Sequence, residues 1–231
     1  MKPFALPRSF RWMLAFALAV TLAVPPISVL IPSTGSKLIG SDQPALYAGE
    51  PKTPFLAAFI RQVMDGQAGR ITGIYSSGIF AAPVVQQPSG NPGFVSSAPD
   101  TITQFQSSSY YGSLGFLAHN TLAGRFFSRF GEGDSIVLVH GDGSYQFYRV
   151  AQILHYQAVN PESQFSDFID LENGSRLNYY DLFLETYGVS GRVVLQTCID
   201  ANGNGSWGRL FIIAFPMRPT AASILLKAKA E

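Results

Sequence analysis

Charged side chains are scarce in this 231-residue chain: Lys, Arg, Asp and Glu make up 13% of it, about half the share that is usual in soluble proteins. With 47% hydrophobic residues, the sequence is unlike an intrinsically disordered chain, which has too little apolar surface to form a core. The 16 basic and 15 acidic residues nearly cancel, which argues against a nucleic-acid-binding protein, because such proteins carry a basic face. We therefore expect one folded domain with an appendage.

Cysteine is almost absent as well. Cys198 is the single cysteine of the sequence, so no disulfide can form within the chain. The sequence also has no cluster of residues at metal-ligand spacing and no glycine-rich phosphate loop. We therefore expect neither a metal ion nor another obligatory cofactor.

The N-terminal segment is basic and then apolar. Three basic residues precede the stretch 12–31, in which Thr21 and Ser28 are the only polar side chains. A helix of that length spans roughly 30 Å, the hydrocarbon thickness of a bilayer. We interpret residues 1–31 as a membrane anchor that leaves the rest of the chain outside the cytoplasm. The alternative is a signal peptide whose cleavage releases a secreted protein.

Composition divides the remainder into three parts. Residues 32–69 are interpreted as a linker rich in Pro, Gly and Ser, followed by an amphipathic helix that begins at Thr53 and Pro54 and ends before Asp65. Residues 70–218 are the expected globular domain, and residues 219–231 are a C-terminal tail.

The domain consists of short runs of β-branched and aromatic residues separated by Gly, Pro, Asn and Ser. This texture predicts an all-β barrel or sandwich, and the turn 141–143 is a strong hairpin signal. Short helices are expected near residues 122–130 and 178–184. The expected strands are residues 71–75, 79–85, 94–97, 102–105, 114–119, 135–139, 145–154, 193–199 and 209–215.

Side chains suited to covalent chemistry are few. Cys198 ends a strand-like apolar run beside a polar, glycine-rich loop, and a free thiol in an exported protein needs a reason. A lone thiol in such a strand is often only a small core residue. However, a hairpin would bring Arg209, at the start of the next run, back towards Cys198, where it would supply fixed donors to an oxyanion. A neighbouring imidazole would raise the thiolate fraction of the cysteine, and His119, His140 and His155 are the possible partners.

In order and spacing, three segments resemble the sortase family. These are the segment around His119, the hairpin between residues 133 and 150, and the Thr197-Cys198 pair followed by Arg209. The resemblance covers about residues 71–216. It implies a closed eight-stranded sortase-type barrel, with Cys198 as nucleophile, His119 as general acid/base and Arg209 holding the substrate carbonyl. It also implies that Thr197 helps to shape the oxyanion site.

The resemblance implies a thiol transpeptidase of the cell envelope. Such an enzyme cleaves a C-terminal sorting signal of an exported protein through a thioacyl intermediate. It then transfers the product to an amine from the cell wall or from another protein, or to water in a hydrolase. The alternative is a non-catalytic surface barrel that binds a peptide or glycan and keeps these residues for packing. An L,D-transpeptidase fits less well, because Cys198 does not follow a Ser/Thr-His-Gly run.

Overall fold

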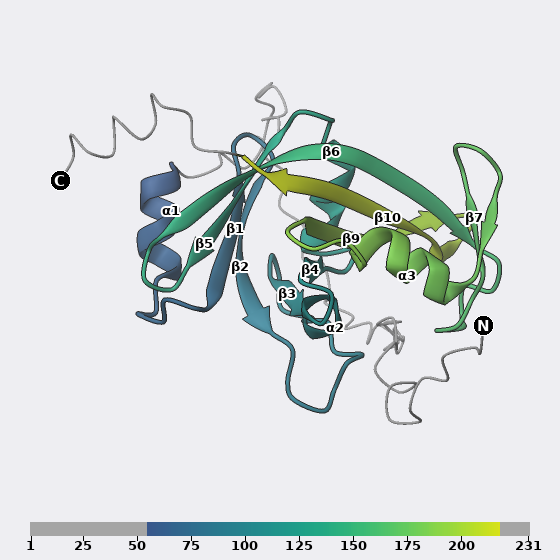
Figure 1. Cartoon of the computed structure of the whole chain (residues 1–231), viewed down its shortest axis with the longest axis horizontal. Helices are drawn as coiled ribbons and strands as arrows, with labels where there is room; N and C mark the ends of the chain where they lie inside the picture. The colour runs from purple at the N-terminus through teal and green to yellow at the C-terminus, as the bar shows by residue number, and fades with distance from the viewer. Residues whose placement is uncertain (1–54, 218–231) are drawn as a thin grey trace, which may run out of the picture. The chain divides into compact units, whose positions relative to one another are not determined.

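The computed structural model describes residues 55–217. Within this range the strands form one ten-stranded sheet (Figure 1). They are β1 (Ile71–Ser76), β2 (Phe80–Gln86), β3 (Ile102–Phe105), β4 (Leu114–Leu117), β5 (Ser135–His140), β6 (Tyr145–Ala158), β7 (Phe168–Asp170), β8 (Arg176–Leu177), β9 (Val193–Ala201) and β10 (Asn204–Pro216). The helical elements are α1 (Leu56–Val63), α2 (Gln106–Ser109), the 3₁₀ helix η2 (Ala123–Arg129) and α3 (Tyr179–Tyr187).

The sheet closes into a barrel. Its strand order is β10-β9-β4-β3-β2-β1-β5-β6-β7-β8, and β10 also pairs with β6. Eight strands therefore form a ring, from which β7 and β8 extend beyond β6. The pairs β2–β3 and β4–β9 are parallel, and the other pairs are antiparallel. The closed eight-stranded barrel that the resemblance to sortases implies is thus confirmed.

The interior of the barrel is a continuous apolar core. Alternate residues of a strand point to opposite faces of the sheet, and every strand of the ring contributes its inward-facing set. On β9 these inward residues are Val193 and Leu195, and on β10 they include Leu210 and Ile212. Within each strand, residues at alternate positions therefore face the core, and those between them face outward. Two residues of a strand that are an even number of positions apart have the same parity and share a face.

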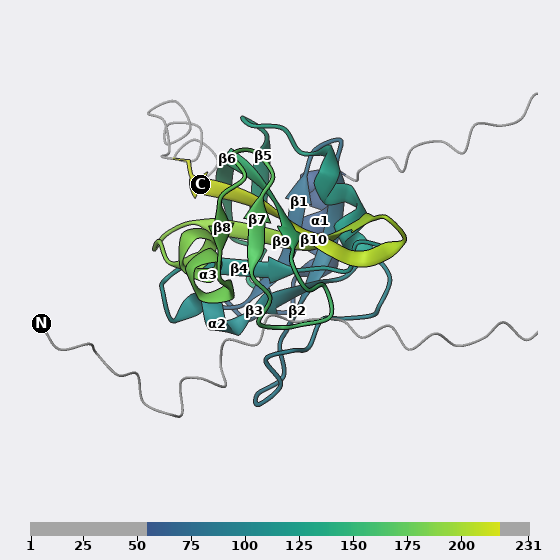
Figure 2. The ribbon, with the colours of Figure 1, turned by 90° about the vertical axis from the view of Figure 1, so that its right-hand side faces the viewer.

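Two helices cover separate parts of the outer face (Figure 1). Helix α1 buries Phe59 against Tyr75, Val137 and Val139 of β1 and β5. Helix α3 packs its buried rings against outward-facing residues of β4, β9 and β10, including Val194 and Phe211. Figure 2 shows α3 beside β7 and β8, on the side away from α1.

The helix predictions are largely confirmed. Both expected short helices exist, as η2 and as α3, and the side chain of Asn178 caps α3 by accepting hydrogen bonds from the backbone of Tyr180 and Asp181. Helix α1 begins at Leu56 after Phe55, without a side-chain cap. The proposed start at Thr53 and Pro54 lies outside the described residues, as do residues 1–31, the rest of the linker and the whole tail. In the described range no helix is both long and apolar enough to span a bilayer.

The strand expected at residues 94–97 is wrong. These residues belong to a loop in which the buried amide of Gln87 donates to the carbonyls of Pro92 and Phe94, both at 3.0 Å. The backbone N–H of Ser96 is bound by Thr103 Oγ1 at 2.8 Å rather than by a neighbouring strand. Conversely, the short strands β7 and β8 were not expected from the sequence.

Candidate active site

Cys198 and Arg209 lie on the neighbouring strands β9 and β10, and His119 lies just beyond the end of β4, on the other side of β9. Cys198 on β9 lies directly opposite Arg209 on β10. On the other side of β9, the parallel ladder with β4 pairs Leu117 with Gln196 and continues with a bond from the Ala118 N–H to the Gln196 carbonyl. Because the two strands run in the same direction, His119 follows at the level of Cys198. Cys198 and Arg209 are thus a cross-strand pair, and His119 lies in the turn that follows β4 on the other side of β9. We call these three residues the row.

Cys198 and Arg209 lie on the outer face of the barrel. Cys198 has the parity of Val194 and Gln196, whereas Val193 and Leu195 face the core. Arg209 likewise shares its face with Phe211. His119 and Cys198 are partly buried, so both can be reached from solvent while being held by the sheet.

Thr197 stands on the opposite face from Cys198. Only 4% of Thr197 is exposed, and its hydroxyl donates a 2.8 Å hydrogen bond to the carbonyl of Ala118. Strand β4 ends at Leu117. Beyond this end, the bond from Thr197 holds Ala118, the residue immediately before His119, against β9. The predicted contact of Thr197 with substrate stays a prediction, while its bond to the histidine turn is a feature of the fold.

The turn after His119 is tight and depends on a glycine. The carbonyl of His119 accepts hydrogen bonds from the N–H groups of Leu122 (3.0 Å) and Gly124 (2.9 Å). A Cβ on Gly124 would lie 2.7 Å from the His119 carbonyl oxygen and 2.9 Å from that of Ala118, and would also meet Thr197 Oγ1. The backbone can therefore fold over His119 in this way only if residue 124 has no side chain.

Arg209 is a buried cation. Only 2% of the residue is exposed, and its Nη1 donates to the carbonyls of Ser206 (3.0 Å) and Gly208 (2.8 Å). Its Nε is buried and has no hydrogen-bond partner, and the guanidinium lies 5.9 Å from the ring centre of Phe168. An unpaired buried donor such as this Nε–H costs free energy.

The row continues into β6. Tyr156 lies directly opposite Arg209, is fully buried, and donates a 2.8 Å hydrogen bond from its hydroxyl to Glu185 of α3. Burial, followed by the bond to Glu185, raises the pKa of Tyr156 well above its ordinary value. Tyr156 therefore stays a neutral donor at physiological pH, and it fixes α3 to the strand that flanks Arg209.

The other two histidines lie outside the row. His140 ends β5 at the hairpin turn, where its N–H is bound by the Ser144 carbonyl. His155 is exposed on β6, opposite Leu210. Of the three histidines that the sequence offers, His119 alone is brought to the level of Cys198.

Two aromatic residues of α3 have a structural role. Phe183 and Tyr187 are fully buried between α3 and the barrel. The hydroxyl of Tyr187 donates to Gln196 Oε1 at 2.6 Å. The connection between β6 and β9 therefore braces the strand that carries Cys198.

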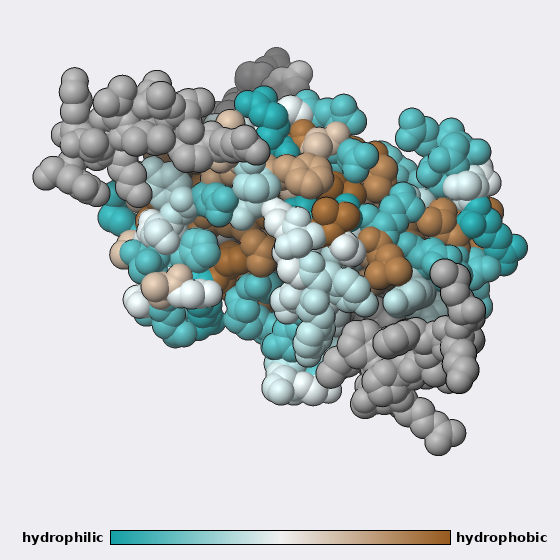
Figure 3. All heavy atoms as spheres, viewed as in Figure 1, coloured by the Kyte–Doolittle hydropathy of each residue, from teal (hydrophilic) through white to brown (hydrophobic). Residues whose placement is uncertain are grey.

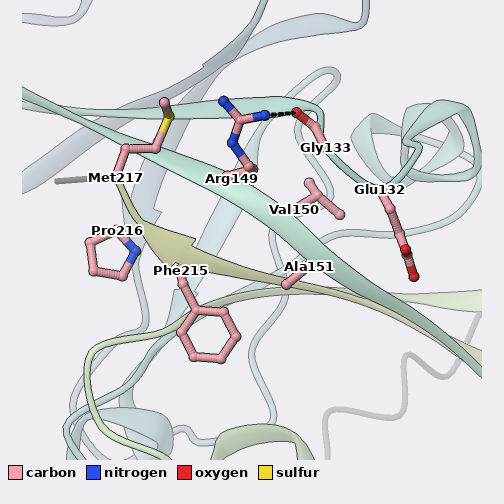
Figure 4. Close-up of a pocket in the computed structure, with 8 residues that line it drawn as sticks. All are labelled: Glu132, Gly133, Arg149, Val150, Ala151, Phe215, Pro216 and Met217. Carbon is pink, nitrogen blue, oxygen red and sulfur yellow. Dashed lines mark hydrogen bonds between the residues drawn. The ribbon is translucent and has the colours of Figure 1, made fainter. Parts of the chain in front are cut away.

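A pocket of about 540 Å³ lies elsewhere (Figure 4). Residues near Arg149 on β6 line it together with Phe215, Pro216 and Met217 at the end of β10. Phe215 is six residues beyond Arg209, or roughly 20 Å of extended strand, so the pocket is separate from the row.

On the face drawn in Figure 3, hydrophobic surface occurs as separate patches among hydrophilic residues. No group of three or more His, Cys, Asp or Glu suited to a metal ion occurs in residues 55–217.

No protein-family model and no curated protein sequence matches the chain. The solved structures that match include sortases. Sortase A from Corynebacterium diphtheriae is 15% identical, with 66% of this chain and 62% of that chain covered and a TM-score of 0.42. Listeria monocytogenes sortase A is 12% identical, with 66% of this chain and 93% of that chain covered and a TM-score of 0.40. Clostridium perfringens sortase C with the C-terminal cell wall sorting motif is 15% identical, with 71% of this chain and 83% of that chain covered and a TM-score of 0.40.

Sequence reasoning missed two contributors to the site, Gly124 and Asn120. Asn120 donates from its side-chain amide to the Gly205 carbonyl at 3.0 Å, across 85 positions of sequence. Neither residue is of a type that performs covalent chemistry. The available signal was the position of Asn120 directly after a candidate histidine.

Proposed function

We propose that this chain is a sortase-like cysteine transpeptidase. The observation that carries the proposal is the row, in which Cys198 and Arg209 pair across adjacent strands of a closed barrel and His119 follows the end of the strand on the other side of Cys198. A nucleophile with a base on one side and a fixed cationic donor on the other is the arrangement that acyl transfer requires.

The reaction begins with attack of the Cys198 thiolate on a backbone carbonyl carbon of the substrate. An S–C bond forms, and the carbonyl oxygen becomes an oxyanion that the guanidinium of Arg209 stabilises. When the intermediate collapses, the C–N bond breaks and protonated His119 gives its proton to the leaving amine. The product is a thioester on Cys198.

The thioester is resolved by an amine. The amine attacks the same carbonyl carbon, an amide bond forms, Cys198 Sγ leaves, and His119 takes the proton that the attacking nitrogen loses. Water in place of the amine would give a hydrolase. Because Cys198 and His119 each return to their starting state, the cycle needs no cofactor.

The proposed substrates are exported proteins with a C-terminal sorting signal. The proposed acceptor is an amine of the cell wall or of a second protein. The catalytic domain then acts outside the cytoplasm, and the N-terminal leader holds it at the membrane or directs its secretion.

The test is intact-mass spectrometry of the full chain after incubation with a pool of Leu-Pro-x-Thr-like and variant peptides. We expect an adduct equal in mass to the N-terminal peptide fragment on the wild-type chain and none on Cys198→Ala. Cys198→Ser is the closer structural control. If no peptide gives an adduct, and Cys198 is alkylated no faster than cysteine in a short peptide, the transpeptidase proposal is wrong and the binding barrel is favoured.

A further inference from the structure

The turn that carries His119 is fastened to the fold on both sides of the histidine. Before it, the Ala118 carbonyl accepts from the buried hydroxyl of Thr197. After it, the amide of Asn120 donates to the Gly205 carbonyl. The first bond reaches the strand of Cys198, and the second reaches the hairpin between β9 and β10.

Gly205 lies in an irregular part of that hairpin. Asn204 pairs with Ala201 and Gly208 pairs with Ile199, and the register shifts between these two pairs. The residues in between are therefore not held by a regular ladder, and other contacts must fix their positions. One of these contacts is local, from the Ser206 N–H to Asn204 Oδ1 at 2.8 Å.

The same irregular stretch also holds Arg209. Nη1 of Arg209 donates to the carbonyls of Ser206 and Gly208, so the position of this stretch determines where the guanidinium lies. Asn120 binds the carbonyl of the residue just before Ser206. A continuous series of contacts therefore runs from the histidine turn through Asn120 and Gly205 to the arginine.

We propose that Asn120 is a positioning residue that sets the histidine turn and the guanidinium of Arg209 relative to Cys198. The inference rests on the proposed function, in which these three side chains act together. A small misplacement of a reacting group is costly, since a shift of about 1 Å can lower a rate by as much as 10²-fold. Asn120 itself touches neither substrate nor the reacting atoms in this scheme.

The bond runs from the Asn120 amide donor to the Gly205 carbonyl acceptor, and this direction suggests an informative substitution. Asn120→Asp has nearly the same shape but presents a carboxylate oxygen to the Gly205 carbonyl, so that attraction becomes repulsion. Asn120→Ala removes the donor without adding repulsion. Glu162→Ala is the matched control, because Glu162 Oε1 accepts from the Asn204 amide at 3.4 Å and thus contacts the hairpin without reaching the histidine turn.

The first measurement is the steady-state rate with a reactive peptide. We expect kcat to fall about three- to tenfold in Asn120→Ala and further in Asn120→Asp, with KM within twofold of the wild type and an unchanged melting temperature. Such losses correspond to one solvent-accessible hydrogen bond. Glu162→Ala should keep wild-type kcat. Equal kcat in the wild type and Asn120→Asp would overturn the inference.

The second measurement needs no substrate. The rate of Cys198 alkylation by iodoacetamide is followed from pH 5 to 10 in the wild type, Asn120→Asp, Glu162→Ala and His119→Ala. We expect the profile of Asn120→Asp to lie between those of the wild type and His119→Ala, and that of Glu162→Ala to match the wild type. Superimposable wild-type and Asn120→Asp profiles would refute the positioning role.

The two measurements separate the inference from the proposed function. A wild-type chain that alkylates in a His119-dependent way but forms no peptide adduct refutes transpeptidation and leaves the role of Asn120 to the pH profiles. A wild-type chain that forms the adduct and whose kcat is insensitive to Asn120→Asp refutes the inference alone.

Discussion

Thr197 Oγ1 donates a 2.8 Å hydrogen bond to the carbonyl of Ala118. These two residues directly precede the candidate nucleophile and the candidate base. A single buried bond therefore ties the backbone of Cys198 to that of His119. The alternation of side chains puts the hydroxyl on the core face while Cys198 faces outward, so this tie does not occupy the space that a substrate would need.

Thr197→Val should destabilise the domain by about 1–3 kcal/mol, because the buried Ala118 carbonyl loses its partner while the shape of the side chain is kept. Thr197→Ser keeps the hydroxyl and should recover most of the loss apart from that of a buried methyl group. Urea unfolding followed by tryptophan fluorescence measures both. A Thr197→Val chain as stable as the wild type would show that the bond contributes nothing net.

Gly124→Ala should displace the histidine turn. The added methyl group meets two backbone carbonyls, of Ala118 and His119, and backbone cannot move aside cheaply. We expect a loss of stability of about 1–3 kcal/mol, typical of overpacking, together with a lower rate of Cys198 acylation. Gly131→Ala is the control, since its Cβ would be 3.7 Å from the nearest atom, Asp134 Oδ2. The interpretation fails if the two variants behave alike.

Tyr187→Phe should destabilise the domain and change its response to alkali. The variant leaves the buried Gln196 Oε1 without the 2.6 Å bond from Tyr187, at a cost of about 1–3 kcal/mol. Burial raises the pKa of Tyr187 well above its ordinary value of 10.0. Below pH 10 the Tyr187 hydroxyl is neutral in both the folded and the unfolded state, so its contribution to stability is complete. As the pH rises above 10, the hydroxyl ionises in the unfolded state first, and this contribution is lost.

The measurement is the free energy of unfolding between pH 8 and 11. In the wild type it should fall steeply above about pH 10, and in Tyr187→Phe the fall should be shallower. The raised pKa of Tyr156 leaves part of the slope in both proteins. Parallel curves would mean that Tyr187 does not ionise differently in the folded and unfolded states.

Asn178→Ala should lower stability by about 1 kcal/mol, the usual cost of losing a helix N-cap. The side-chain oxygen Oδ1 of Asn178 accepts from the N–H groups of Tyr180 (2.9 Å) and Asp181 (3.0 Å). Asn178→Ser should be close to the wild type, because serine is also a good cap. Thermal unfolding with circular dichroism distinguishes the pair, and equal melting temperatures for Ala and Ser would contradict the capping role.

Local pattern was sufficient to predict most of the barrel strands and the pairing of Cys198 with Arg209, because these two residues lie on one hairpin. His119 could be chosen from the three histidines only through the resemblance to sortases. The strand before it, β4, pairs with β9, which lies far along the chain, as the pair of Leu117 with Gln196 shows. The strand wrongly expected at residues 94–97 fails because the side chain of Gln87 binds the backbone carbonyls of Pro92 and Phe94 and holds the segment as a loop. The strands β7 and β8 have three and two residues, too few for any periodicity.

Closure of the barrel limits how a peptide can bind beside Cys198. Peptides often bind by adding a strand to a free sheet edge, but β10 is paired with both β9 and β6. Strand β9 is paired with β10 on one side and, up to Gln196, with β4 on the other. On the β10 side of Cys198 a peptide would therefore have to cross the face of the sheet rather than extend it, and its sequence would be read there through side chains and not through a backbone ladder.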